Sequence, residues 1–312
     1  MPENMPDKKS TVIITGGSGL VGRYLTSVLL AEGYKVCHLS RKQDQFGRVR
    51  VYRWDPVRQI IDPVVLEGID YIIHLAGANI GEKRWTKKRR EEIIKSRVDS
   101  SGLIYRTIAE NKIPLKAYIS ASGISYYGAV TSDKIFVEDD PPATDFLGNT
   151  CRLWEESADQ LKNLGIRTVK IRTAVVLEKN DGALARLFLP ARLGIFPMVG
   201  GGHQYMPWIH INDMCNIYLK AIEDEKMEGA YNAVAPHHVT FNDFMKTLSQ
   251  VLKKSYFHPP VPAFVLRTVM GEMSDVILKG SRISPEKIIK AGYRFAFDNL
   301  QDALRDIISS GT

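Results

Sequence analysis

Four glycines near the start of the chain have the spacing of a phosphate-binding loop. Gly16, Gly19 and Gly22 form a GxGxxG pattern, and Gly17 lies beside the first of them. A backbone without Cβ atoms can approach a diphosphate closely, and the free N–H groups at the start of a helix attract its charge. The alternative is a tight strand–helix turn without a ligand. The residues predicted to contact a dinucleotide here are Gly16, Gly17, Ser18, Gly19, Leu20, Val21 and Gly22.

The residues after the second apolar run indicate which dinucleotide binds. A site for NAD usually places Asp or Glu about 20 residues after the glycines, where it bonds the ribose 2′-hydroxyl. This chain has Ser40, Arg41 and Lys42 there and no acid. Arg and Lys form charge-assisted hydrogen bonds with a 2′-phosphate. We therefore expect NADP(H) rather than NAD, the alternative being that Arg41 and Lys42 are plain surface charges.

Short apolar runs alternate with amphipathic segments over the first 177 residues. Runs typical of buried strands lie at 11–15, 35–39, 49–52, 71–75, 115–120 and 168–172, and helical patterns lie at 21–29, 86–111 and 149–164. Strands that alternate with helices predict parallel pairing with right-handed crossovers. The fold class is therefore expected to be α/β, with a Rossmann-type doubly wound parallel sheet.

The pattern changes after residue 177. Glycines and prolines cluster between residues 194 and 207, and helical patterns follow near 212–224, 240–253, 262–279 and 300–308. We expect a dinucleotide-binding domain at 1–177 and a smaller C-terminal lobe at 178–312, interleaved with the carboxyl edge of the sheet.

Three groups of residues in this framework resemble the extended short-chain dehydrogenase/reductase superfamily, which includes sugar-nucleotide epimerases and dehydratases. They are the glycine segment 15–22, the run 74–77, and the stretch from Ser120 to Gly128. More narrowly, the chain resembles the atypical branch of epimerase family proteins over nearly its whole length. That likeness is carried by the segments 84–85, 96–98, 126–128, 154–155, 204, 208–210, 271–272, 284–285 and 292–293.

The resemblance implies a set of binding residues. Beyond the glycine segment and residues 40–42, it implies cofactor contacts from Leu75, Ala76, Gly77, Arg97, Ser120, Ala121 and Arg172. Arg97 lies on the helix that borders the cofactor in this superfamily, so it is expected to touch a phosphate. Gln204, Trp208 and His210 are expected to shape the pocket for a small-molecule substrate.

The catalytic residues typical of the superfamily are present only in part. Ser122 matches the Ser that orients the substrate oxygen, but no Tyr of this chain has Lys four residues later. Cys151 and Glu155 stand near the positions of that Tyr–Lys pair. Glu155 is interpreted as an exposed acid near a helix start, favoured by the helix dipole.

Two functional hypotheses follow from this departure. In the first, the chain is an NADP-dependent oxidoreductase or epimerase, and Tyr126, Tyr127 or Cys151 moves the proton next to Ser122. In the second, the chain only binds NADP(H) and senses its redox state. The alternative for Cys151 is a small buried side chain, and for the two tyrosines it is aromatic packing.

The composition argues against several other classes of protein. No apolar run reaches about 18 residues, and the first ten residues lack the apolar core of a signal peptide. Cys37, Cys151 and Cys215 are too widely spaced for a disulfide framework or a metal site. The net charge is +7 and basic residues cluster at 84–97, but no aromatic interleaving suggests nucleic acid. We expect a cytoplasmic monomer or homodimer, with no nucleic-acid or membrane partner.

Overall fold

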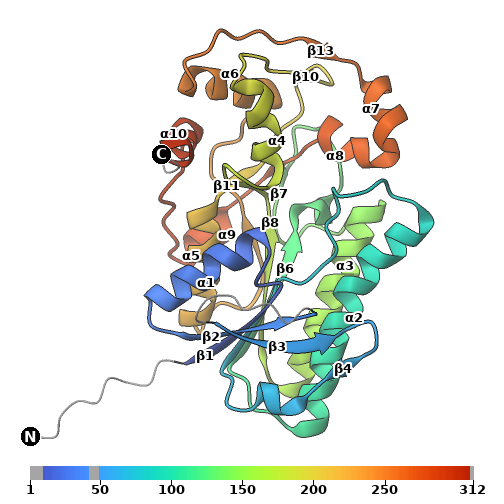
Figure 1. The fold of residues 1–312 in the computed structure, drawn as a ribbon, viewed down its shortest axis with the longest axis vertical. Helices are drawn as coiled ribbons and strands as arrows, with labels where there is room; N and C mark the ends of the chain where they lie inside the picture. The colour runs from blue at the N-terminus through green and yellow to red at the C-terminus, as the bar shows by residue number, and fades with distance from the viewer. Residues whose placement is uncertain (1–9, 42–48, 310–312) are drawn as a thin grey trace, which may run out of the picture.

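The computed structural model describes residues 10–41 and 49–309, and it is built around an eight-stranded sheet (Figure 1). Seven neighbouring strands run parallel, and the eighth, at one edge, is antiparallel. The predicted Rossmann-type doubly wound sheet is therefore confirmed. In spatial order the strands are β12 (Gly229–Ala233), β8 (Arg167–Thr173), β6 (Ala117–Gly123), β5 (Tyr71–His74), β1 (Thr11–Thr15), β2 (Lys35–Ser40), β3 (Arg50–Asp55) and β4 (Ile60–Ile61).

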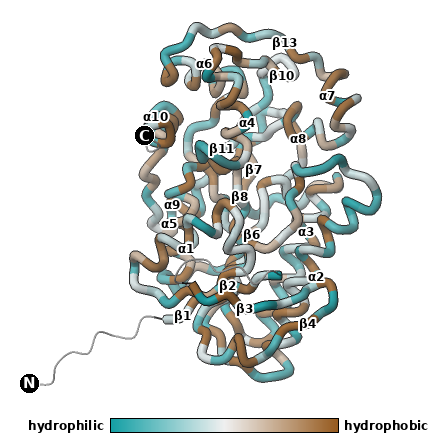
Figure 2. Tube along the Cα trace, in the orientation of Figure 1, coloured by the Kyte–Doolittle hydropathy of each residue, from teal (hydrophilic) through white to brown (hydrophobic). Residues whose placement is uncertain are grey.

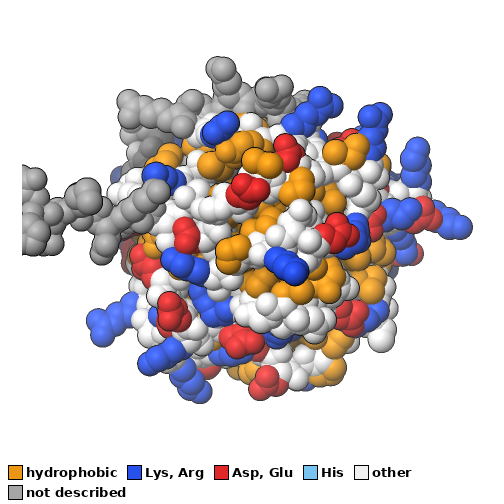
Figure 3. Space-filling view, turned by 90° about the horizontal axis from the view of Figure 1, so that it is seen from below, with side chains coloured by type: hydrophobic (Ala, Val, Ile, Leu, Met, Phe, Trp, Pro, Cys, Tyr) orange, Lys and Arg blue, Asp and Glu red, His pale blue; other side chains and the backbone are white. Residues whose placement is uncertain are grey.

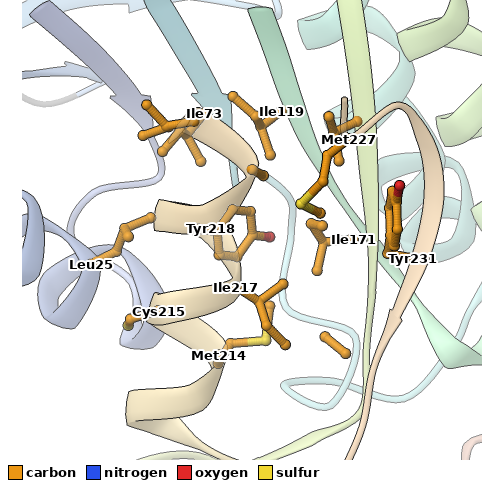
Figure 4. Close-up of a cluster of buried hydrophobic side chains, with 14 of the residues drawn as sticks. Leu25, Ile73, Ile119, Ile171, Met214, Cys215, Ile217, Tyr218, Met227 and Tyr231 are labelled. Atoms are coloured by element: carbon orange, nitrogen blue, oxygen red, sulfur yellow. The ribbon is translucent and has the colours of Figure 1, made fainter. Parts of the chain in front are cut away.

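Helices cover both faces of this sheet. On one face α1 (Leu20–Ala31) and α5 (Ile211–Glu223) pack together, and on the other face lie α2 (Lys87–Asn111) and α3 (Phe146–Asp159). Successive residues of β1 alternate between the two layers: Ile14 joins the α1–α5 core shown in Figure 4, and Ile13 joins the core under α2. Hydrophobic and hydrophilic residues alternate along α2 (Figure 2), as expected for a helix with one buried side.

A smaller lobe covers the carboxyl edge of the sheet, at the top of Figure 1. Its core, separate from those of the sheet, is formed mainly by α4 (Gly182–Ala191), α6 (Phe241–Val251) and α10 (Leu300–Ser309). The structure also has three short parallel strand pairs: β9 (Val175–Leu177) with β11 (Trp208–His210), β10 (Met198–Val199) with β13 (Pro260–Val261), and β7 (Ile135–Phe136) with β14 (Arg282–Ile283).

The chain after residue 178 contributes to both parts. Helix α5 and strand β12 return to the sheet, and the lobe is tied back to α5 by Asp213. The Asp213 carboxylate accepts hydrogen bonds from the Tyr293 hydroxyl at 2.7 Å and from the backbone N–H groups of Ala296 and Phe297 at 2.8 and 3.0 Å. The division at residue 177 into two interleaved parts stays a prediction.

Two expectations about elements were incomplete. Strand β12 was not expected, because Gly-Ala-Tyr-Asn-Ala lacks the β-branched residues that mark the other strands. The helix expected at 262–279 was wrong: it breaks into α7 (Ala263–Met270), a 3₁₀ turn η4 (Gly271–Ser274) and α8 (Asp275–Leu278). Gly271 has φ +62°, outside the right-handed helical region, so the chain turns there.

Strand β12 forms one edge of the sheet, and side chains occupy its outer backbone groups. The N–H of Asn232 donates to the Glu138 carboxylate at 2.8 Å, and the Lys287 ammonium donates to the carbonyl of Ala230 at 2.8 Å.

Within the described parts of the chain, no helix is both long and apolar enough to cross a membrane. The face in Figure 3 mixes acidic, basic and hydrophobic side chains, so it presents no block of one charge.

Candidate active site

The glycine segment joins the end of β1 to the start of α1 through close backbone packing. A Cβ atom added at Gly22 would lie 2.4 Å from the carbonyl oxygen of Gly16. A Cβ atom at Gly17 would lie 2.5 Å from the His38 ring. The contact at Gly22 is with backbone, so the turn requires glycine there, whereas a side chain at Gly17 would require the buried His38 ring to move.

The first turn of α1 is suited to an anion. Its N-cap residue is Gly19, no side chain caps the helix, and its first turn contains no acidic residue. The N–H groups of this turn therefore lack side-chain acceptors, and the helix dipole is not neutralised locally. A cradle of glycines in front of an uncapped helix fits the diphosphate of a dinucleotide.

A second loop lies against the glycine segment. The N–H groups of Leu75 and Ala76, which follow β5, donate to the carbonyl and the Oγ1 of Thr15, both at 3.1 Å. A Cβ atom added at Gly77 would lie 2.9 Å from the guanidinium carbon of Arg97. The predicted residues 75–77 and Arg97 therefore lie together beside the end of β1.

Arg97 is a half-buried cation next to this loop. Its Nη1 donates to the carbonyls of Ala78 and Ile93 at 3.1 and 2.9 Å, and its guanidinium lies over the Trp154 ring at 4.8 Å. Burial lowers the pKa of Arg97 to about 10, and no carboxylate of the described residues pairs with it. Burying a cation costs free energy unless it is paired, so an anionic group of a ligand would stabilise it.

The residues expected to select the 2′-phosphate are described only in part. Ser40 ends β2 and is half-buried, and Arg41 is exposed. Lys42 lies outside the described residues.

A network of buried polar groups lies where β6 and β8 end. Ser122 and Arg172 are register partners on these strands, so both side chains point to the face covered by α3. Arg172 binds both carboxylate oxygens of Glu155, from Nε at 2.8 Å and from Nη2 at 3.0 Å. The Ser122 hydroxyl donates to Glu155 Oε1 at 2.7 Å.

Glu155 is the residue of this network whose setting the sequence reasoning missed. The expectation of an exposed acid at a helix start was wrong, because its side chain is buried on the inner side of α3 and paired with Arg172. The charge reversal from the expected Lys was visible in the sequence, but its partner lies on another element. Arg172 was expected to contact ligand, and its guanidinium is instead committed largely to Glu155.

The two tyrosines after β6 differ in their surroundings. The Tyr127 hydroxyl donates to Asn232 Oδ1 at 2.7 Å and accepts from Arg172 Nη1 at 2.8 Å, and burial raises its pKa. Tyr126 is half-buried, and its ring lies against the Arg172 guanidinium with 3.5 Å between the guanidinium carbon and the ring centroid. Of the two phenols, only Tyr126 retains exposed surface on the network.

Cys151 is close to the network but poorly suited to carry a proton. Its sulfur would lie 3.7 Å from a Cβ atom added at Gly123. Burial, reinforced by the Glu155 charge, raises the pKa of the Cys151 thiol to about 12. The thiol is therefore neutral near pH 7, and it behaves as a small buried side chain.

Ser120, on β6, is also buried, and its hydroxyl donates to the carbonyl of Ala121 at 2.9 Å.

The three residues expected to contact substrate brace the smaller lobe in this structure. Trp208 is fully buried in the lobe's core. Gln204 is buried, and its Nε2 donates to the carbonyls of Val199 and Ile277, both at 3.0 Å. Both side chains are therefore used in packing and offer no surface to a ligand.

His210 has a structural role at the start of α5. Its Nδ1 accepts the N–H of Asn212 at 3.1 Å, so it caps the helix, and its ring stacks on Phe297 with 3.9 Å between centroids. It borders a pocket of about 130 Å³ that also involves Tyr24 and Asp306. This pocket contains none of the residues at the ends of β6 and β8.

Comparisons with known proteins agree with this geometry. The chain matches the model of the NAD dependent epimerase/dehydratase family over residues 12–233 and a domain of unknown function (DUF1731) over residues 261–307. It is 34% identical over 302 residues to the mouse epimerase family protein SDR39U1, covering 96% of this chain and 99% of the relative. It is 35% identical over 301 residues to the epimerase family protein YfhF of Bacillus subtilis, covering 96% of this chain and 98% of the relative.

A solved structure is similar over the same length. The crystal structure of human epimerase family protein SDR39U1 (isoform 2) with NADPH has a TM-score of 0.85 and 31% identity, covering 96% of this chain and 99% of that chain. The likeness therefore includes the sheet and the smaller lobe together.

Proposed function

Because this chain belongs to the NAD-dependent epimerase/dehydratase family, we propose that it is an NADP(H)-dependent oxidoreductase or epimerase that acts on a small polar substrate. The family expected from the sequence motifs is confirmed, whereas the reaction is our proposal. The observation that carries it is the uncapped start of α1 behind the glycine cradle, which fits a dinucleotide diphosphate.

The preference for NADP(H) rests on two observations. Ser40, Arg41 and Lys42 follow β2 where an NAD site usually has an acid. The similar human protein was solved with NADPH. Arg97, a half-buried cation that no carboxylate of residues 10–41 and 49–309 pairs with, would hold a phosphate of the same cofactor. Residues 75–77, Ser120 and Ala121 would line the path of the cofactor along the sheet edge.

The chain's own residues would divide the remaining work. The cofactor, when bound, supplies the acceptor or donor of a hydride. Ser122 would orient the substrate oxygen, and Tyr126 is the candidate that would move a proton. Tyr127 and Cys151, the other candidates, are disfavoured by committed hydrogen bonds and by burial.

Titration calorimetry with NADPH, NADP⁺, NADH and NAD⁺ tests the binding part of the proposal. We expect micromolar or tighter binding of the two phosphorylated forms, and affinity at least about tenfold weaker without the 2′-phosphate, since two charge-assisted hydrogen bonds would be lost. Arg41→Ala with Lys42→Ala should remove this difference, and Arg58→Ala, an exposed arginine elsewhere, should not. Absence of heat with all four dinucleotides from a folded sample would exclude the proposal.

A second candidate function is favoured by the same network. Tyr127 and Cys151 are buried and protonated, which is expected if the chain binds NADP(H) and senses its redox state without catalysis. A panel of alcohols and carbonyls distinguishes the two candidates. Turnover of the cofactor that is lost in Ser122→Ala would establish an enzyme, and binding without turnover across the panel would favour the sensor.

A further inference from the structure

The Ser122 hydroxyl has a single proton, and it donates this proton to the buried Glu155 carboxylate. Ser122 and Glu155 are 4% and 5% exposed, and the Oγ–Oε1 distance is 2.7 Å. Arg172 holds both oxygens of the carboxylate, so Glu155 keeps its orientation toward Ser122. A hydroxyl has one donor and two acceptor positions. Ser122 is therefore left with acceptor positions alone.

Donation to a carboxylate is the stronger choice for this proton. Hydrogen bonds to an ionised partner are roughly twice as strong as neutral ones. If Ser122 turned its proton toward a ligand carbonyl, it would exchange the bond to Glu155 for a weaker one. The buried carboxylate would also lose one of its partners, which costs further free energy.

The neighbouring groups have their hydrogens directed inward as well. The Tyr127 proton goes to Asn232, and Arg172 Nη1 donates to Tyr127 and to the carbonyl of Glu138 at 3.0 Å. The Cys151 thiol is a weak donor and is buried. These buried donors around Ser122 are therefore already used within the protein.

We propose that Glu155 is a specificity-determining residue that fixes Ser122 as a hydrogen-bond acceptor, so that the substrate oxygen bound there belongs to a hydroxyl group and not to a carbonyl group. This inference rests on the proposed function, because it needs Ser122 at the substrate. Glu155 stands near the position where the superfamily has Lys, and the inference gives this difference a role. A lysine ammonium has three donors and no acceptor, so it could not accept the serine proton.

Glu155→Leu should remove the preference. Leucine has no acceptor, so the Ser122 proton would be free to donate to a carbonyl while Ser122 could still accept from a hydroxyl. Ser122→Ala, which removes the acceptor, should also abolish the preference. Glu156→Leu is a matched control, because Glu156 makes the same kind of contact with an arginine, Arg152, at the surface of the same helix.

The test measures binding of matched alcohol and ketone pairs, such as cyclohexanol with cyclohexanone and glycerol with dihydroxyacetone. The protein is saturated with tetrahydro-NADP, which cannot transfer a hydride, and dissociation constants up to 100 mM are measured by ligand-observed NMR. We expect the wild type and Glu156→Leu to bind alcohols about tenfold more tightly than ketones. The ratio should fall to about one in Ser122→Ala and in Glu155→Leu.

Three outcomes would overturn the assignment. They are equal or tighter binding of ketones by the wild type, an unchanged ratio in a folded Glu155→Leu protein, and no binding of any pair by a cofactor-saturated sample. If Glu155→Leu fails to fold, an unchanged ratio in Ser122→Ala has the same force. Failure of the cofactor itself to bind would instead defeat the proposed function, so the two failures are separable.

Discussion

At the scale of single residues, buried polar side chains of this protein are held in one protonation state by their surroundings. Burial opposes the charge of Arg172, but the neighbouring Glu155 carboxylate raises the pKa of Arg172, and burial keeps Cys151 as a thiol. His74 is a further example on β5: its ring nitrogens lie 2.8 Å from Thr15 Oγ1 and 3.0 Å from Ser100 Oγ. Such groups couple protonation to folding.

His74 should make the protein less stable in mild acid. Burial lowers its pKa from 6.5 to about 3. The unfolded chain therefore takes up a proton near pH 6.5 that the folded chain refuses until about pH 3. The free energy of unfolding should be independent of His74 above pH 6.5 and should decrease by up to about 1.4 kcal/mol per pH unit below it.

Urea unfolding between pH 7.5 and 4.5 measures this slope. His38 and His210 also have lowered pKa values and add to the slope in the same direction. The comparison is therefore between the wild type and His74→Gln, which should lose one proton's share of the slope. Parallel pH curves for the two proteins would contradict the prediction.

The sequence allowed part of the site to be predicted at this scale. Ser122 and the departure at Cys151 and Glu155 were found from the resemblance to the superfamily. The pairing of Glu155 with Arg172 was not, because it joins a helix to a strand whose neighbours in space depend on the folded sheet. Burial of Tyr127 and Trp208 was likewise invisible, since aromatic residues occur both in cores and in ligand pockets.

At the scale of elements, the strand–turn–helix unit β1–α1 carries the strictest requirements. Its turn places the carbonyl of Gly16 against the first turn of α1, and that contact leaves no volume for a methyl group at Gly22. The same contact aligns the free N–H groups of the helix start.

Gly22→Ala should therefore damage both folding and binding. The added methyl group would lie 2.4 Å from the Gly16 carbonyl oxygen, so the turn must shift. We expect a loss of about 1–3 kcal/mol in unfolding free energy and at least about tenfold weaker NADPH binding. Gly102→Ala, within α2, is the control, because its methyl group would meet only the Arg106 side chain at 3.5 Å. Unchanged NADPH affinity in Gly22→Ala would refute the proposed close packing.

Elements with strong local signals could be predicted from the sequence, and those defined by long-range contacts could not. The run Thr11–Thr15 was predicted with the bounds that the structure has, because Val and Ile favour a buried strand. The strand β12 depends on its pairing with β8, some 60 residues earlier in the chain, and has little propensity of its own. Helix 262–279 looked continuous because its apolar spacing continues past Gly271.

At the scale of the whole molecule, the smaller lobe is fastened to the sheet by buried hydrogen bonds. Asp213 on α5 accepts three of them from the segment 293–297, which lies in the region that matches DUF1731. The C-terminal region and the sheet should consequently unfold together.

Asp213→Asn tests this coupling. The amide nitrogen cannot accept a hydrogen bond, so at least one buried N–H or hydroxyl group would lose its partner. We expect a loss of about 3 kcal/mol and a separate, earlier transition of the C-terminal region. Asp302→Asn on the surface of α10 should change stability by less than about 0.5 kcal/mol. Thermal unfolding followed by tryptophan fluorescence and by circular dichroism would reveal the split, and a single transition with wild-type stability would argue against it.

The outer side of β12 has a consequence for how the molecule behaves among its own copies. An edge strand with unpaired N–H and C=O groups can pair with a strand of another molecule and so extend the sheet. Here an acid and an amine, Glu138 and Lys287, already hold the outward backbone groups of Asn232 and Ala230. A strand from a second molecule would have to displace both charged side chains. We therefore do not expect these molecules to polymerise through the β12 edge at high protein concentration.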